Sequence, residues 1–244
     1  MKKKTVRSHQ QLVMNSRINT PLEDYLSALI KEFSCNADPK NARGQKAYMK
    51  DQFEFLGIKA PIRQHIQKPF LAKPHLPPKR ELDSIIHQLW NQPYREYQYF
   101  AQELALKYVK DLEKRDLALL EYMIIHFSWW DTVDFIAAKL VGAYLKTFPE
   151  ERKTCVERWL SSEDLWLKRT AILFQLKYKI ETDTELLSHI IRSLTCTREF
   201  FINKAIGWAL REYGKTNPDW VTQFAEQTQL SPLSRKEALR RIIQ

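Results

Sequence analysis

The sequence is poor in the residues that break or cross-link a chain. Only 5 of its 244 residues are glycine, and its three cysteines, Cys35, Cys155 and Cys196, are far apart and odd in number. This cysteine usage argues against a disulfide framework and for a reducing compartment. No apolar run approaches the ~18 residues that a membrane span needs, and no apolar stretch follows the basic N-terminus as in a signal peptide. We therefore expect a cytoplasmic protein without a membrane segment.

Several motifs of enzyme chemistry are also missing. There is no phosphate-binding glycine loop, no G-x-S-x-G elbow and no zinc spacing among the histidines and cysteines. We expect no metal and no cofactor. What the chain has in excess is positive charge, +10 from 39 Lys+Arg against 29 Asp+Glu. This charge favours a polyanionic partner, nucleic acid first and an acidic membrane second, but alone it also fits an unspecialised basic protein.

The apolar residues recur three and four apart over long windows, and almost nothing alternates with period two, so the sequence predicts an all-α protein. One expected helix covers residues 42–53, and another runs through "SWWDTVDFIAAKLVGAYL". Later helical segments repeat at steps of 36, 34, 34 and 33 residues, measured between Ala101, Ala137, Ala171, Ala205 and Ala238. Two helices per step indicate an α-α superhelix of stacked helix pairs with a concave face.

A compact irregular helical bundle is the alternative to the superhelix. We expect residues 20–244 to form a single repeat domain, and we expect residues 1–19 to be a basic, flexible arm.

Three charged or aromatic side chains stand out when these helices are projected at 100° per residue. Arg169 falls in the middle of an apolar stripe, where an unpaired charge would cost several kcal/mol. Asp134 lies in a largely apolar face beside Trp130 and small side chains. Trp208 is the converse, because its face carries cations that include Lys204 and Arg211. Each of the three is a candidate functional residue.

Each candidate also has a structural interpretation. Asp134 and Arg169 are equally well explained as an ion pair between adjacent repeats, and Trp208 as a core tryptophan with a solvated rim. Nearby, Ser128 and Asp131 fit a capping box that starts a helix, and Trp129 is out of phase with Trp130 and therefore expected in the core. The residue pattern leaves functional and structural roles about equally supported.

A resemblance to a known family favours the functional roles. The stretches "SWWDTVD", "LWLKRTAILFQL" and "FFINKAIGWALREYGK", in this order, together with "QKAYMKDQFEFLGIKAP", resemble the bacterial DNA alkylation repair glycosylases of the AlkD type over residues 20–242. The resemblance implies HEAT-like repeats with a concave basic face that binds duplex DNA as a monomer in the cytoplasm, at the nucleoid. It also implies hydrolysis of the N-glycosidic bond of cationic N3- or N7-alkylated purines.

The resemblance assigns roles to individual residues. Asp134 would be the catalytic carboxylate, and Trp130 and Trp208 would pack against the deoxyribose of the damaged nucleotide. Arg169 would hold the adjacent phosphate. Further DNA contacts are carried over to Lys177, Arg211, Lys215 and, by a looser match, Tyr48.

These roles predict a monofunctional glycosylase without lyase activity, because no lysine is singled out as a Schiff-base nucleophile. The family is understood to act without flipping the base, so we expect bulky cationic N7 adducts to be excised too. Two rivals remain: a non-catalytic helical-repeat protein that binds damaged or branched DNA, and a protein–protein scaffold.

Overall fold

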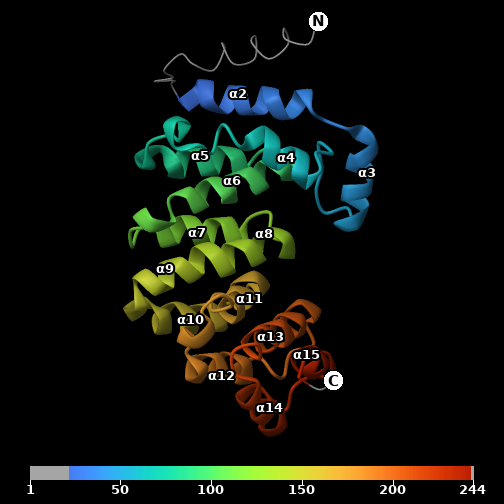
Figure 1. Cartoon of the computed structure of the whole chain (residues 1–244), viewed down its shortest axis with the longest axis vertical. Helices are drawn as coiled ribbons and strands as arrows, with labels where there is room; N and C mark the ends of the chain where they lie inside the picture. The colour runs from blue at the N-terminus through green and yellow to red at the C-terminus, as the bar shows by residue number, and fades with distance from the viewer. Residues whose placement is uncertain (1–21, 243–244) are drawn as a thin grey trace, which may run out of the picture. The chain divides into compact units, whose positions relative to one another are not determined.

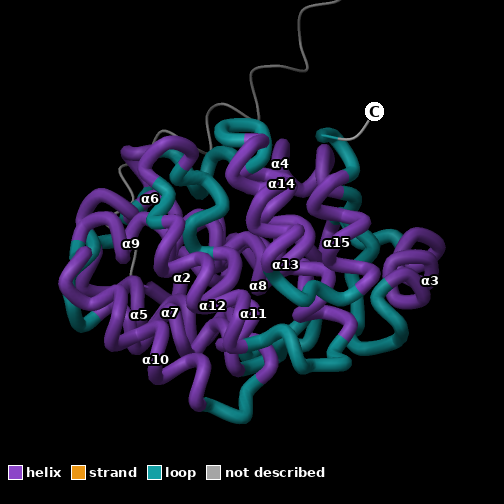
Figure 2. Tube along the Cα trace, turned by 90° about the horizontal axis from the view of Figure 1, so that it is seen from below, coloured by secondary structure: helices purple, strands orange, loops and turns teal. Residues whose placement is uncertain are grey.

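The computed structural model describes residues 22–242, and within them every regular element is a helix (Figures 1 and 2). A single parallel β-bridge, between Glu54 and Tyr94, is the extent of β pairing in this described part of the chain. The prediction of an all-α fold is therefore confirmed. The expected basic arm, residues 1–19, lies outside the described residues. No helix between residues 22 and 242 is long and apolar enough to cross a membrane.

The chain divides into two compact units, the first formed by residues up to Ile85 together with Pro93–Glu96. The prediction of a single domain over residues 20–244 stays a prediction. The described part of this first unit contains α2 (Leu22–Cys35), α3 (Pro39–Tyr48), α4 (Ala60–Gln67), the start of α5 (Leu82–Trp90) and the 3₁₀ turns Lys73–His75 and Lys79–Glu81. The helix expected over residues 42–53 instead ends at Tyr48, because Lys50 and Asp51 adopt positive φ angles of 56° and 58°.

A buried carboxylate organises the loop after α3. Glu96, fully buried in the first turn of α6 (Arg95–Lys107), accepts hydrogen bonds from the backbone N–H groups of Leu56, Gly57 and Ile58 at 3.0, 2.9 and 3.1 Å. Gly57 has φ +89°, and a Cβ there would stand 2.0 Å from the Asp38 carbonyl oxygen. No larger residue fits at this position.

We expect Glu96→Gln to lower the free energy of unfolding by about 2–3 kcal/mol, because the new amide group would face a buried N–H donor that loses its acceptor. Thermal or urea unfolding measures the loss. Glu226→Gln, at an exposed glutamate of α14 (Pro218–Gln227), is the control and is expected to change little. Equal stability of the two variants would show that the three hydrogen bonds do not hold the loop.

The second unit contains residues Ile86–Gln92 and Tyr97 onward. After α6 it comprises α7 (Asp116–Ile125), α8 (Trp130–Phe135), a π-helical segment (Ile136–Val141), α9 (Gly142–Thr147), α10 (Arg152–Ser161), α11 (Leu165–Leu173), α12 (Thr184–Ser193), α13 (Phe200–Tyr213), α14 and α15 (Pro232–Leu239). Three 3₁₀ turns, Val109–Asp111, Pro149–Glu151 and Lys179–Glu181, lie between helices.

The helices of this unit alternate between two rows. The row that carries the candidate site runs from α8 to α11, α13 and α15, each packed against the next (Figure 1). The five alanines that mark the repeat steps lie on α6, the π-helical segment, α11, α13 and α15, and all five are fully buried. A small residue at each of these positions lets successive helices approach closely, which accounts for the regular spacing found in the sequence.

Candidate functional site

Asp134 and Arg169 meet across the interface between α8 and α11. The Arg169 guanidinium donates from Nε to Asp134 Oδ1 at 2.7 Å and from Nη2 to Oδ2 at 2.9 Å, a two-pronged ion pair. Its Nη1 donates to the backbone carbonyl of Phe201 at the start of α13. The Arg169 side chain is 4% exposed and the Asp134 side chain 16%, so the carboxylate is the more accessible partner.

Local sequence features place the two side chains. Asp164 caps α11, accepting from the N–H groups of Trp166 and Leu167 at 2.8 and 2.9 Å, and thereby fixes the phase that turns Arg169 inward. Asp134 stands two residues before the π-helical segment. Such π turns widen a helix locally and occur often at functional sites.

The predicted capping box at Ser128 is wrong. The N-cap of α8 is Trp129, and no side chain caps it. Ser128 Oγ instead donates to the Ile124 carbonyl at 2.6 Å, and Asp131 accepts a 2.6 Å hydrogen bond from the hydroxyl of Tyr99 on α6. Asp131 therefore joins two successive repeats. The sequence does not predict this contact, because the capping motif already accounts for the residue.

Burial is the largest influence on the Asp134 carboxyl and raises its pKa above the ordinary value for aspartate. The hydrogen bonds and the charge of Arg169 act in the opposite direction, and the charge of Asp131 adds to the increase. The ionised form of Asp134 is thus held chiefly by Arg169.

Trp130 is the first residue of α8 and stands one turn before Asp134 on the same face, half-buried. Trp208, in the middle of α13, is also half-buried. Trp129, expected in the core, is only half-buried and packs against Trp166 and Phe201 with ring centroids 5.7 and 5.2 Å away. Its Nε1 is buried without a hydrogen-bond partner. The aromatic cluster of Trp129, Trp166 and Phe201 thus includes the residue whose backbone carbonyl accepts a hydrogen bond from Arg169.

The cations on the face of Trp208 are paired with carboxylates. Arg211 and Lys204 both form ion pairs with Glu237 of α15, and the Lys204 contact measures 2.6 Å. The hydrogen bond from Lys204 is the largest cause of the lowered pKa of Glu237, and the charges of Lys204 and Arg211 lower it further. Lys215 binds Glu212 at 2.5 Å. The other two predicted DNA contacts are exposed: Lys177 follows α11 in a turn, and Tyr48 ends α3 in the first unit.

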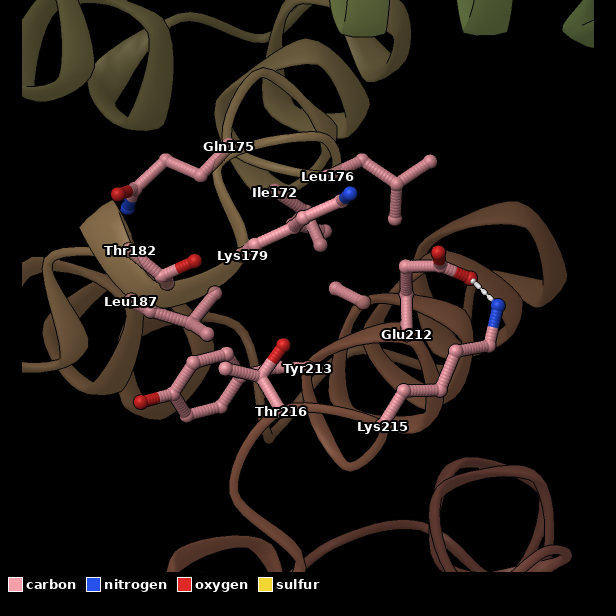
Figure 3. A pocket seen from close by; sticks show the side chains of 11 residues that line it. Ile172, Gln175, Leu176, Lys179, Thr182, Leu187, Glu212, Tyr213, Lys215 and Thr216 are labelled. Carbon is pink, nitrogen blue, oxygen red and sulfur yellow. Dashed lines mark hydrogen bonds and ion pairs between the residues drawn. The ribbon is translucent and has the colours of Figure 1, made fainter.

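A cavity of about 270 Å³ lies in the second unit between the end of α11, α12 and α13 (Figure 3). Its apolar wall includes Ile172, Leu176 and Leu187, and the Glu212–Lys215 ion pair lines one side. Neither Asp134 nor Arg169 lines this cavity, and the two tryptophans of the candidate site do not line it either. No group of three or more metal-binding side chains is found within residues 22–242.

The fold and the site together define a helical-repeat protein with a carboxylate–guanidinium pair at a repeat interface, in which the guanidinium is buried and the carboxylate is partly accessible. Residues 29–242 match the model of the family described as "DNA alkylation repair enzyme", and the chain belongs to this family. It is similar to a solved structure described as a predicted DNA alkylation repair enzyme from Enterococcus faecalis, with 36% identity and a TM-score of 0.80. That similarity covers 86% of this chain and 98% of the other. No curated protein matches the chain significantly.

Proposed function

We propose that the protein is a monofunctional DNA glycosylase that hydrolyses the N-glycosidic bond of cationic N3- or N7-alkylated purines in duplex DNA, without base flipping. The observation that carries the proposal is the partly accessible carboxylate of Asp134, held at both oxygens by Arg169 in a member of a DNA alkylation repair family. The proposal requires no metal and no cofactor.

The charge of the damaged base explains why one carboxylate can suffice. Cleavage of a glycosidic bond passes through an oxocarbenium-like state with positive charge on the sugar. A neutral base needs a general acid to leave, whereas an N-alkylated purine already carries a positive charge. The electron pair of the breaking bond neutralises that base, water adds to C1′, and one proton of the water is released. Asp134 stabilises the sugar cation; one bare charge pair at ~4 Å is worth on the order of 4 kcal/mol at an effective dielectric constant near 20.

The neighbouring side chains have supporting roles in this mechanism. Trp130 and Trp208 pack against the deoxyribose, and a π face near a cation contributes about 1–2 kcal/mol. Arg169 keeps Asp134 ionised and oriented, and its two N–H groups outside the three hydrogen bonds reach a backbone phosphate. Lys177, Arg211, Lys215 and Tyr48 are the proposed further contacts to DNA.

The test is to compare duplexes that differ in the charge of one base. The protein should release N7-methylguanine and bulkier cationic N7 adducts, measured as free base by mass spectrometry, and should leave neutral uracil or hypoxanthine in place. Release of the neutral bases would require a general acid and would contradict the mechanism. Loss of activity once the adduct exceeds a methyl group would contradict action without a base pocket.

One observation favours a second candidate, a non-catalytic protein that binds damaged or branched DNA. Both oxygens of Asp134 already accept hydrogen bonds from Arg169, as expected of a structural ion pair between repeats. DNA binding without release of any base would support this candidate.

Binding should depend steeply on salt if phosphate contacts dominate. Lys177 is exposed and Arg211 is held by Glu237, so Lys177 is the better-placed of the two cations to bind a phosphate. We expect Lys177→Gln to make the slope of log K against log salt concentration less steep by about 0.9. Fluorescence anisotropy on a duplex measures the slope, with Lys153→Gln, an exposed lysine of α10, as control. Identical slopes for the two variants would remove Lys177 from the binding surface.

A further inference from the structure

The cavity between α11, α12 and α13 lies beside Arg169 and Trp208 but is lined by neither (Figure 3). Its residue Ile172 follows Arg169 by three residues on α11, where side chains at this spacing are neighbours. Its residue Glu212 follows Trp208 by four residues on α13 and is likewise a neighbour. A molecule in the cavity would therefore touch both helices that carry the site, and the proposed reaction gives the cavity no occupant.

The cavity has an apolar wall large enough for a small ring. Its members are buried aliphatic side chains, Ile172, Leu176, Leu187 and Ala209. The volume of the cavity is about 270 Å³, whereas an apolar cavity of roughly 150 Å³ already holds benzene. A ring with a short side chain therefore fits against this wall. Burial of the ring there is favourable, because it removes apolar surface from water.

A lysine without a carboxylate partner stands over the apolar wall. Within residues 22–242 the Nζ of Lys179 forms no ion pair, and Glu181 of the same turn binds Lys146 instead. The side chain of Lys179 extends over the cavity in Figure 3. The other lining cation, Lys215, is bound to Glu212 at 2.5 Å. The charged side chains around the cavity therefore carry +1 in total, and this charge is that of Lys179.

The backbone that carries Lys179 is fixed on both sides. Lys179 has a positive φ of 54°, which is a costly conformation for a residue with a side chain. Just before it, the buried Tyr178 donates from its hydroxyl to the carbonyl of Gly142 at 2.6 Å. Just after the turn, the side chain of Gln175 binds the N–H and the carbonyl of Asp183 at 2.8 and 3.3 Å. The turn therefore presents Lys179 to the cavity from a fixed position.

Two hydroxyl groups complete the polar side of the cavity. Thr182 and Thr216 line it, and in Figure 3 their hydroxyls point into it. Neither hydroxyl has a hydrogen-bond partner in the part of the chain that the structure describes. A hydroxyl and an ammonium group both donate hydrogen bonds, and a carboxylate accepts them.

We propose that the cavity binds a small apolar carboxylate, whose apolar body lies against Ile172, Leu176 and Leu187 and whose carboxylate accepts from Lys179. The apolar wall selects the body of the ligand, and the charge of Lys179 selects its acid group. This inference goes beyond the proposed function and does not depend on it.

Three probes separate the two halves of this site. Phenylacetate has both a ring and a carboxylate, phenylacetamide has the same shape without the charge, and acetate has the charge without the ring. Each is titrated at constant ionic strength into the full chain with ¹³C-labelled isoleucine and leucine methyl groups, which are followed by NMR. Phenylacetate should shift the methyl signals of Ile172, Leu176 and Leu187 saturably and leave those of Leu104, a buried residue of α6, in place.

The affinities should rank in a defined order. For a ligand of about ten non-hydrogen atoms we expect a dissociation constant on the order of 1 mM for phenylacetate. Acetate should bind at least about 10-fold more weakly, because it buries no ring. Phenylacetamide should bind about 3–5-fold more weakly, which is the effect expected of one ion pair open to solvent.

A substitution of the exposed Lys179 tests its role without disturbing the fold. In Lys179→Gln the affinity for phenylacetate should fall about 3–5-fold, to that of phenylacetamide, while the affinity for phenylacetamide stays the same. Lys153→Gln, at the exposed lysine of α10, is the matched control and should bind all three probes as wild type does.

Several results would overturn the inference. Acetate that binds as tightly as phenylacetate would reduce the site to a surface cation, and phenylacetamide that binds as tightly would reduce it to an apolar cavity. Shifts that do not saturate, or that miss the three wall residues, would also overturn it, as would an unchanged affinity of Lys179→Gln for phenylacetate. The comparison of probes on wild-type protein decides the question even if the variant does not fold. Base release enters none of these measurements, so their failure and the failure of the proposed function are independent.

Discussion

Asp134→Asn should abolish release of N7-methylguanine, with the single-turnover rate constant reduced by at least about 10²–10³-fold. Asparagine has almost the shape of aspartate and can still accept a hydrogen bond from Arg169 through its one remaining oxygen. It carries no charge, however, and therefore cannot stabilise the sugar cation. The rate is measured by quantifying free base from duplex DNA with the protein in excess.

The control for this variant is Asp219→Asn, at an exposed aspartate in the first turn of α14, which should behave as wild type. Circular dichroism establishes that both variants fold, and binding to duplex DNA should be retained in both. A rate for Asp134→Asn within a few-fold of wild type would assign the Asp134–Arg169 pair to the structure of the repeats alone.

Arg169→Gln should nearly eliminate base release at neutral pH and restore part of it as the pH rises. Burial raises the pKa of Asp134, and Arg169 is the group that opposes the increase, so removing the guanidinium raises this pKa further. The protonated carboxyl is inactive, so the rate declines as the pH falls through the pKa of Asp134, and that decline should begin at a higher pH in the variant. We expect a loss of about 10²-fold at pH 7. A pH profile of the single-turnover rate measures both effects.

Removing one partner of a buried ion pair also costs about 3–5 kcal/mol of stability, so a second substitution is needed. Arg169→Lys keeps the positive charge but loses the two-pronged geometry, and its rate and pH profile should lie between those of wild type and Arg169→Gln. Arg158→Gln is the matched control, because Arg158 holds Glu121 at the surface through bonds of 2.9 and 2.6 Å. If the single-turnover rate begins to decline at the same pH in wild type and in Arg169→Gln, the role given to Arg169 is contradicted.

The fold was predictable because its signals are repeated along the sequence. Apolar spacing gave the helices, and the five buried alanines gave the repeat step. The end of α3 was not predictable from helical periodicity, because it depends on two positive φ angles, at Lys50 and Asp51. The π-helical segment within "DFIAAKLV" has no signature of its own in a sequence that reads as continuous helix.

Candidate site residues could be recognised in the sequence because they are charged side chains on otherwise apolar helix faces. A charge in an apolar stripe singled out Asp134 and Arg169, and the structure brings these two side chains together. The third contact of Arg169 could not be found in this way, because a backbone carbonyl, that of Phe201, carries no sequence signal. The predicted start of α8 was one residue too early, so Asp131 was interpreted as a capping residue. Its hydrogen bond with Tyr99 on α6 was therefore not predicted.

Cleavage of a glycosidic bond by this chain can be tested through the products of a single reaction. Wild-type protein is incubated with duplex DNA that contains a single N7-methylguanine, and both the free base and the strand are analysed by mass spectrometry. We expect free N7-methylguanine in equal amount to an uncleaved abasic strand, with neither product formed by Asp134→Asn. An intact methylated strand after incubation with folded, DNA-bound wild-type protein would contradict it.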